Sequence, residues 1–152
     1  MYKILGITIA ILNALAALNS TWFFLGMAKV TPTEWFFFNA CAPAIALFLV
    51  GYIFKDKMIQ SMSIPALAFF GLGGMFVFPW TGMNIIAQIG HIFMTLAIAW
   101  ITYGIFKDKS FKEATVGFLL AAFLVNAFIA VQQMYVGRHL DKLQEVINWK
   151  PK

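Results

Sequence analysis

The amino-acid sequence predicts an all-α integral membrane protein, folded as a compact bundle of transmembrane helices. Two observations predict this class. Hydrophobic residues make up 62% of the chain and charged residues only 11%. The apolar residues also form long runs, and residues 4–28 contain no charged side chain. A helix needs about 20 such residues to cross about 30 Å of hydrocarbon. The 152 residues leave room for one bundle and no soluble domain of ordinary size.

Charged and turn residues divide the chain into five candidate spans. Their approximate bounds are 4–28, 35–54, 64–80, 83–106 and 114–136, so residues 1–136 form the transmembrane bundle. The first apolar run exceeds the core of a secretory signal, which has about 7–15 residues, and we expect a retained helix. The third span is short and contains Gly71, Gly73 and Gly74. A re-entrant segment is the alternative there, provided that it is buried in protein or lines a water-filled cavity.

The lysines in the connections predict the orientation of the bundle. With five spans, one side of the membrane receives Lys3, Lys55, Lys57, Lys107, Lys109 and Lys112. Cytoplasmic connections carry an excess of lysine and arginine, so we expect a cytoplasmic N-terminus. The other side receives Lys29 and the basic residues of the tail. These are Arg138, Lys142, Lys150 and Lys152.

The tail, residues 137–152, has a different pattern from the spans. Leu140, Leu143 and Ile147 recur at helical spacing after Val136, with charged residues on the other faces. This pattern is typical of an amphipathic helix that lies at the membrane interface or binds a partner, with Trp149 as an anchor. The alternative is a simple extension of the fifth helix into water.

A polar stripe on the fourth span is the main candidate for function. Its members share one helical face and are Asn84, Gln88, His91, Thr95 and Thr102. Such a stripe is costly against lipid and must face other helices or water. We expect it to line a hydrated pathway, with Asn39 and Asn126 as further lining candidates. A polar packing core is the alternative interpretation.

The first span has a complementary face of small and polar residues, which are Gly6, Ala10, Asn13, Ala17 and Ser20. Small residues let helix backbones approach closely, and the asparagine and serine can form hydrogen bonds across the contact. We therefore expect this face to pack against other helices. In the second span, Pro43 is expected to produce a kink.

Several function classes are disfavoured by what the spans lack. The middle of each span contains no Asp, Glu, Lys or Arg, and proton relays use such groups. The chain has one cysteine and two histidines at different predicted depths, so we expect no metal, haem or other cofactor. No short catalytic or nucleotide-binding motif occurs, and an enzyme is not predicted. The net charge of +5 is explained by membrane orientation, and we expect no nucleic-acid partner.

One short segment occurs twice in similar form. Residues 51–57 read Gly-Tyr-Ile-Phe-Lys-Asp-Lys, and residues 103–109 read Tyr-Gly-Ile-Phe-Lys-Asp-Lys. A duplicated helical hairpin would explain the pair, as in some transporter folds. The alternative is two ordinary basic turns on the cytoplasmic side, and the similarity does not extend beyond these seven residues.

A second set of residues resembles a known family. Asn19, Gly26, the run Lys29-Val30-Thr31-Pro32 and Asn39 resemble the first hairpin of the urea and amide channel family, which is related to the acid-gated urea channel. The likeness covers about a seventh of the chain, and that family has one span more than is predicted here. The resemblance implies a channel.

We therefore expect a small membrane channel or facilitator for a neutral or weakly polar solute, acting as a homo-oligomer in the lipid bilayer. The alternative is a non-catalytic accessory or assembly subunit of a larger membrane protein complex, with other membrane subunits as partners.

Overall fold

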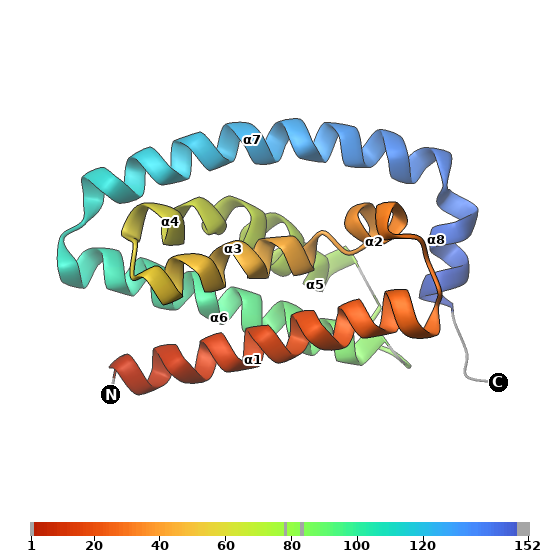
Figure 1. The fold of residues 1–152 in the computed structure, drawn as a ribbon, viewed down its shortest axis with the longest axis horizontal. Helices are drawn as coiled ribbons and strands as arrows, with labels where there is room; N and C mark the ends of the chain where they lie inside the picture. Colours follow the sequence, from red (N-terminus) through yellow and green to blue (C-terminus); the bar gives the residue numbers. More distant parts are fainter. Residues whose placement is uncertain (1, 78, 83, 149–152) are drawn as a thin grey trace.

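The computed structural model describes residues 2–77, 79–82 and 84–148, in which all regular structure is helical (Figure 1). The predicted helical bundle is confirmed. Two of the helices contain π-helical stretches, labelled η. In chain order the elements are α1 (Tyr2–Trp22), η1 (Phe23–Met27), α2 (Pro32–Phe38), α3 (Cys41–Phe54), α4 (Lys57–Ala66), η2 (Leu67–Leu72), α5 (Gly74–Val77), α6 (Asn84–Asp108), α7 (Phe111–Arg138) and α8 (Leu140–Ile147).

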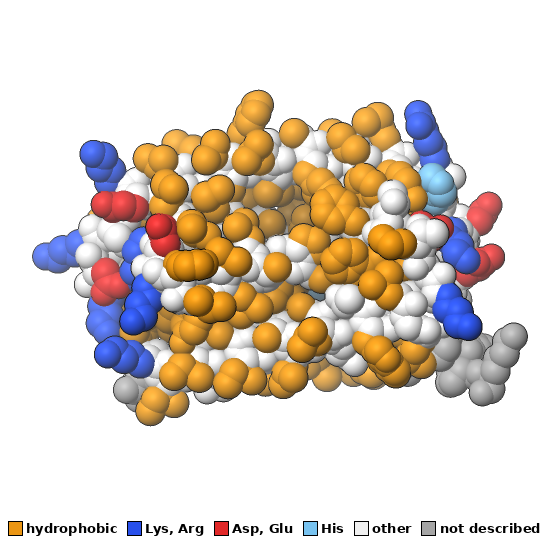
Figure 2. Space-filling view, in the orientation of Figure 1, with side chains coloured by type: hydrophobic (Ala, Val, Ile, Leu, Met, Phe, Trp, Pro, Cys, Tyr) orange, Lys and Arg blue, Asp and Glu red, His pale blue; other side chains and the backbone are white. Residues whose placement is uncertain are grey.

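Four helical stretches are long and apolar enough to cross a membrane. They are Tyr2–Met27, Lys57–Val77, Asn84–Asp108 and Phe111–Arg138. A fifth is obtained if α2 and α3, which meet at a bend of 79°, count as one span. Figure 2 shows hydrophobic side chains along the flanks of the molecule and charged side chains at its two ends. Several apolar helices could therefore cross a membrane, by length and composition.

The third span differs from the sequence prediction, which placed its start near residue 64. Its helix begins at Lys57, because the Asp56 side chain caps it and accepts a hydrogen bond from the Ile59 backbone N–H at 2.9 Å. It continues through the π-helical stretch to Val77. The glycines that suggested a re-entrant segment lie within this stretch and its end, and its full length is sufficient for a span.

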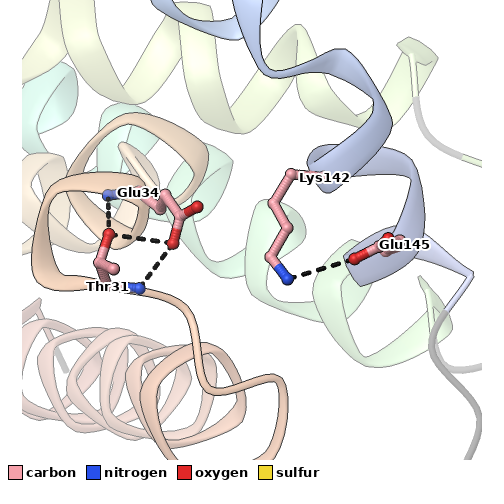
Figure 3. Close-up of polar contacts among 4 residues, drawn as sticks. All are labelled: Thr31, Glu34, Lys142 and Glu145. Carbon is pink, nitrogen blue, oxygen red and sulfur yellow. Dashed lines mark hydrogen bonds and ion pairs between the residues drawn. The ribbon is translucent and has the colours of Figure 1, made fainter.

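The break falls in the second span, between α2 and α3, and not at Pro43. Thr31 and Glu34 form a reciprocal capping box that starts α2, with the Thr31 N–H donating to Glu34 Oε2 at 2.7 Å (Figure 3). Asn39 then leaves the helical region, with φ −119° and ψ 48°. Pro43 lies in the first turn of α3, where a backbone N–H has no partner within the helix. Proline is tolerated there without a kink.

The helices pack in a continuous order around the core. α7 lies along α4, α4 along α3, and α1 contacts both α3 and α6, while the N-terminal half of α6 contacts η2 and α5 (Figure 1). The core is centred on Phe48, Leu67, Met94 and Ile101, all fully buried. At one end of α1, the Tyr2 and Trp100 rings stack with their centroids 5.1 Å apart. α7 has few inward residues, and its apolar outer face is exposed.

The tail forms a separate helix, α8, rather than an extension of α7. The chain turns at His139, whose ring stacks on Tyr135 with centroids 4.2 Å apart. α8 then crosses the end of the bundle (Figure 1) and buries Val146. Its Lys142 lies on the side facing the Thr31–Glu34 turn and pairs with Glu145 at 3.2 Å (Figure 3). The predicted anchor Trp149, Lys150, Lys152 and residue 83 of the fourth span lie outside the described residues.

The two ends of the bundle carry different charge. One end holds the N-terminus and the α3–α4 and α6–α7 turns, and the other holds the α1–α2 connection and α8 (Figure 1). Among the described residues, the first end has six basic residues (Lys3, Lys55, Lys57, Lys107, Lys109 and Lys112) and three acidic ones (Asp56, Asp108 and Glu113). The second has three basic residues (Lys29, Arg138 and Lys142) and three acidic ones (Glu34, Asp141 and Glu145). We call the first the basic end.

Candidate functional site

The bundle contains a polar cluster whose members lie on three helices. The central polar cluster consists of Asn13 on α1, Cys41 at the start of α3, and Gln88, His91 and Thr95 on α6. His91 Nδ1 lies 3.0 Å from Gln88 Oε1, and its Nε2 lies 3.6 Å from Cys41 Sγ. Asn13 and Gln88 are fully buried and His91 is 5% exposed.

Backbone groups tie the cluster to its surroundings. The Asn13 amide donates to the carbonyl oxygen of Phe93 on α6 at 2.9 Å, and also to Ile9 of its own helix. The Gln88 amide donates to the Met75 carbonyl at 3.5 Å, and the Thr95 hydroxyl donates to the His91 carbonyl at 3.0 Å. The cluster therefore joins α1, α3, α5 and α6.

A glycine makes room for the imidazole. A Cβ atom added at Gly74 would lie 2.6 Å from His91 Cε1, closer than side chains approach in real structures. The bend before α3 brings Cys41 to the other side of the same ring. The glycines of the third span thus permit close packing against α6.

The chemistry of the cluster follows from its donors and acceptors. A neutral imidazole can donate from Nδ1 to Gln88 Oε1 and accept the Cys41 S–H at Nε2, so both ring nitrogens have partners. The Cys41 thiol, the His91 imidazole and the Gln88 amide are arranged in the same order as the nucleophile, the base and the orienting group of a cysteine enzyme. The Cys41 thiol can also donate to the Phe70 carbonyl at 3.7 Å. Within the described residues, no three His, Cys, Asp or Glu side chains lie close enough to hold a metal ion.

The other predicted lining residues lie apart from the cluster. Asn84 is half-buried and Thr102 is exposed. The reason is that the buried side of α6 changes along the helix, from Gln88, His91 and Met94 to Ala97, Ile101 and Gly104. Asn39 is buried but donates to the Ser20 hydroxyl at 3.1 Å. Asn126 is exposed on α7, where its amide donates to the carbonyl of Ala122 at 2.7 Å.

The predicted packing face of α1 is turned inward along most of its length. Gly6, Ala10 and Asn13 are buried, and Ala17 packs against the core. A Cβ atom added at Gly6 would lie 2.6 Å from the Trp100 ring. Ser20 is half-buried and donates to the Ala17 carbonyl at 3.1 Å while accepting from Asn39.

Sequence reasoning missed Gln132, which stabilises the break in the second span. Its amide donates to the Phe37 carbonyl at 2.7 Å, one of the carbonyls left without a helical partner where α2 ends. The available signal was its spacing from Ala114, Gly117 and Ala121, which together mark the inner face of α7. Cys41 was missed because a lone cysteine in an apolar run carries no local signal.

Two of the recesses on the described part of the surface lie apart from the central polar cluster. The larger, of about 590 Å³, lies at the basic end between the α3–α4 and α6–α7 turns. The smaller, of about 210 Å³, is apolar and lies between α3 and α7, with Pro43, Phe70 and Phe128 in its walls.

Comparisons with protein-family models, with curated proteins and with solved structures found no match. The likeness of residues 19–39 to the urea and amide channel family therefore stays a prediction from a short motif.

Proposed function

We propose that this protein is a non-catalytic membrane subunit that associates with another membrane helix through the outer face of α7. The first support is the state of the central polar cluster. Gln88, His91 and Asn13 are buried. Gln88 forms a hydrogen bond with His91, and the amides of Gln88 and Asn13 donate to backbone carbonyls of α5 and α6. These contacts fix the bundle internally and leave the outer surfaces for association.

The observation on which the proposal rests is the exposure of Asn126. This residue lies near the middle of α7, among exposed apolar side chains such as Phe123 and Leu119. Its amide nitrogen donates to the Ala122 carbonyl, and its amide oxygen forms no hydrogen bond with a described residue. Gln133 is exposed two turns further along the same side. Amides in hydrocarbon are stabilised by hydrogen bonds to a neighbouring helix, at about 0.6–2 kcal/mol each.

Association can be tested with the double substitution Asn126→Leu and Gln133→Leu. The protein is purified in mild detergent, and its mass is measured by light scattering together with any co-purifying chains. We expect the unsubstituted protein to form a dimer or larger complex, and the double variant to lose it while retaining its helical content by circular dichroism. Phe123→Leu, an apolar exchange on the same exposed helix, serves as the control. A monomeric unsubstituted protein without partners would contradict the proposal.

A channel or facilitator for a small neutral solute is the second candidate. It is favoured by buried amide oxygens that have no hydrogen-bond partner among the described residues, which are those of Asn13, Gln60 and Gln132. Buried polar atoms of this kind are commonly satisfied by internal water. Water beside Asn13 would lie next to the α6 stripe.

The channel proposal is tested by flux into proteoliposomes, with urea and a small amide as probes. Because histidine ordinarily changes charge between about pH 5 and 8, His91→Ala is expected to alter the pH dependence of flux. Thr102→Val, an exposed change on the same helix, is expected to have no effect. Flux equal to that of empty liposomes would rule the channel out.

The unequal charge of the two ends of the bundle supports five spans with the N-terminus in the cytoplasm. In that arrangement the bent pair α2 and α3 counts as one span. The basic end then faces the cytoplasm.

A further inference from the structure

The larger recess at the basic end is formed by two similar turns. Its walls are Lys55, Asp56, Lys57, Met58, Asp108, Lys109, Ser110 and Glu113. These residues come from the two similar segments, 51–57 and 103–109, and the residues that follow each. Lys57 of the first segment forms an ion pair with Asp108 of the second, at 2.7 Å. The recess, of about 590 Å³, is an open depression on the surface.

The two turns hold a lysine in the same unusual conformation. Lys55 follows the end of α3 with φ 55°, and Lys109 follows the end of α6 with φ 54°. Left-handed backbone is uncommon for residues other than glycine, asparagine and aspartate. Each turn therefore keeps a lysine where glycine would be the easier choice for the backbone.

Two of the three carboxylates around the recess already have partners. Asp108 pairs with Lys57, and Asp56 accepts a hydrogen bond from the N-terminus of α4. Glu113 lies in the first turn of α7, where a negative charge complements the helix dipole. Lys55 and Lys109 are exposed and form no ion pair with a described residue, whereas the Ser110 hydroxyl oxygen is buried. The lining of the recess has three basic and three acidic residues, and the excess of positive charge at this end comes from Lys3, Lys107 and Lys112 around it.

An exposed aromatic surface adjoins the lysines. Phe54 precedes Lys55, Phe106 lies in the last turn of α6, and Phe111 begins α7. All three are exposed, and the Phe106 and Phe111 rings meet edge to face with centroids 5.3 Å apart. Cations beside an exposed apolar belt match a molecule with an anionic head and an apolar tail.

We propose that this recess binds the phosphate group of an anionic phospholipid, held by Lys55 and Lys109, with the acyl chains along the phenylalanines. Juxtamembrane lysine clusters attract anionic lipids. A recess between two fixed turns adds a defined position for one headgroup. A free phosphate ion shares the charge but has no group for the aromatic surface. The proposal is independent of the association through α7.

The test uses the full chain in detergent micelles and measures the thermal unfolding midpoint during titration. The ligands are phosphatidylglycerol, phosphatidylcholine and inorganic phosphate. A ligand that binds the folded state raises the midpoint in a concentration-dependent way. We expect phosphatidylglycerol to do so at far lower concentration than the other two.

Substitution of both lysines locates the effect. In the variant Lys55→Asn with Lys109→Asn, the charges are lost but asparagine tolerates the left-handed backbone. The loss of these two juxtamembrane lysines should weaken phosphatidylglycerol binding by about 30-fold. Lys29→Asn with Lys142→Asn removes the same charge from the opposite end and should leave binding unchanged. If the first variant fails to fold, Lys55→Arg with Lys109→Arg is used and should retain binding, whereas Lys109→Asn alone should weaken it.

Equal stabilisation of both double variants by phosphatidylglycerol would overturn the proposed site. Equal effects of phosphatidylglycerol and phosphatidylcholine would overturn the requirement for negative charge. Equal effects of phosphatidylglycerol and inorganic phosphate would overturn the lipid as the ligand.

Discussion

At the scale of single residues, Gly117 sets the distance between α4 and α7. A Cβ atom added there would overlap the Met58 carbonyl oxygen and the Ser61 hydroxyl oxygen. The Met58 oxygen belongs to the backbone of α4 and cannot rotate away. Gly137, on the same helix, has no atom within 4 Å of such a Cβ position. Both glycines lie in α7, but only Gly117 is in close contact with another helix.

We predict that Gly117→Ala destabilises the bundle by about 1–3 kcal/mol, the usual cost of forcing extra volume into a packed contact. Gly137→Ala should leave stability unchanged or raise it by up to about 1 kcal/mol, because alanine is the better helix former. The free energy of unfolding is measured by denaturant titration in mixed micelles. Equal effects of the two substitutions would show that α4 and α7 do not approach closely.

At the scale of helices, the break between α2 and α3 depends on side chains from distant elements. Gln132 on α7 supplies a donor to the Phe37 carbonyl, and Asn39 donates to Ser20 on α1. Where a helix is interrupted inside an apolar environment, such partners replace the lost backbone hydrogen bonds. The bent pair is therefore held by its neighbours and not by its own sequence alone.

We predict that Gln132→Leu destabilises the protein by about 1–3 kcal/mol, because the partly buried Phe37 carbonyl loses its donor. The neighbouring residue provides a matched control, since Gln133 has the same side chain and is exposed. Gln133→Leu should change stability by less than about 0.5 kcal/mol. Thermal unfolding of both variants in detergent measures the difference. A greater loss in the Gln133 variant would contradict the assignment of inner and outer faces.

Much of the architecture could be predicted from the sequence, because long uncharged runs leave few alternatives to membrane helices. The bounds of the first, fourth and fifth spans agree closely with α1–η1, α6 and α7. The second and third spans were harder because their ends depend on local hydrogen bonds. The Asp56 side chain caps α4, so this helix starts earlier than the hydropathy suggests. Gln132 stabilises a break that lies more than 90 residues away in the sequence.

The polar stripe was predicted as one face, and the structure divides it. Helical spacing correctly groups Gln88 with His91, but it cannot tell which neighbour covers each level of α6. η2 and α5 cover the N-terminal half, and Thr102 lies beyond them on an exposed side. Cys41 joins the cluster only because of the bend before α3, which no periodicity indicates.

At the scale of the whole molecule, the unequal charge of the two ends predicts the orientation. Lys112 lies at the basic end and Thr33 at the opposite end, and both are exposed. In a Cys41→Ala background, Thr33→Cys should react with a membrane-impermeant thiol reagent in intact cells. Lys112→Cys should react only after permeabilisation, because lysine-rich connections remain in the cytoplasm. Labelling of Lys112→Cys in intact cells would reverse the proposed orientation or change the number of spans.

The placement of all described charges at the two ends has an electrical consequence. Moving one elementary charge across the bilayer changes the energy by about 2.3 kcal/mol for each 100 mV of membrane potential. A rearrangement confined to Asn13, Cys41, Gln88 and His91 moves hydrogen bonds between neutral groups. In the proposed membrane-spanning arrangement, the potential therefore does almost no work on the interior of this bundle. Its core conformation should be the same in energised and de-energised membranes, and the membrane field acts on it only through its ends.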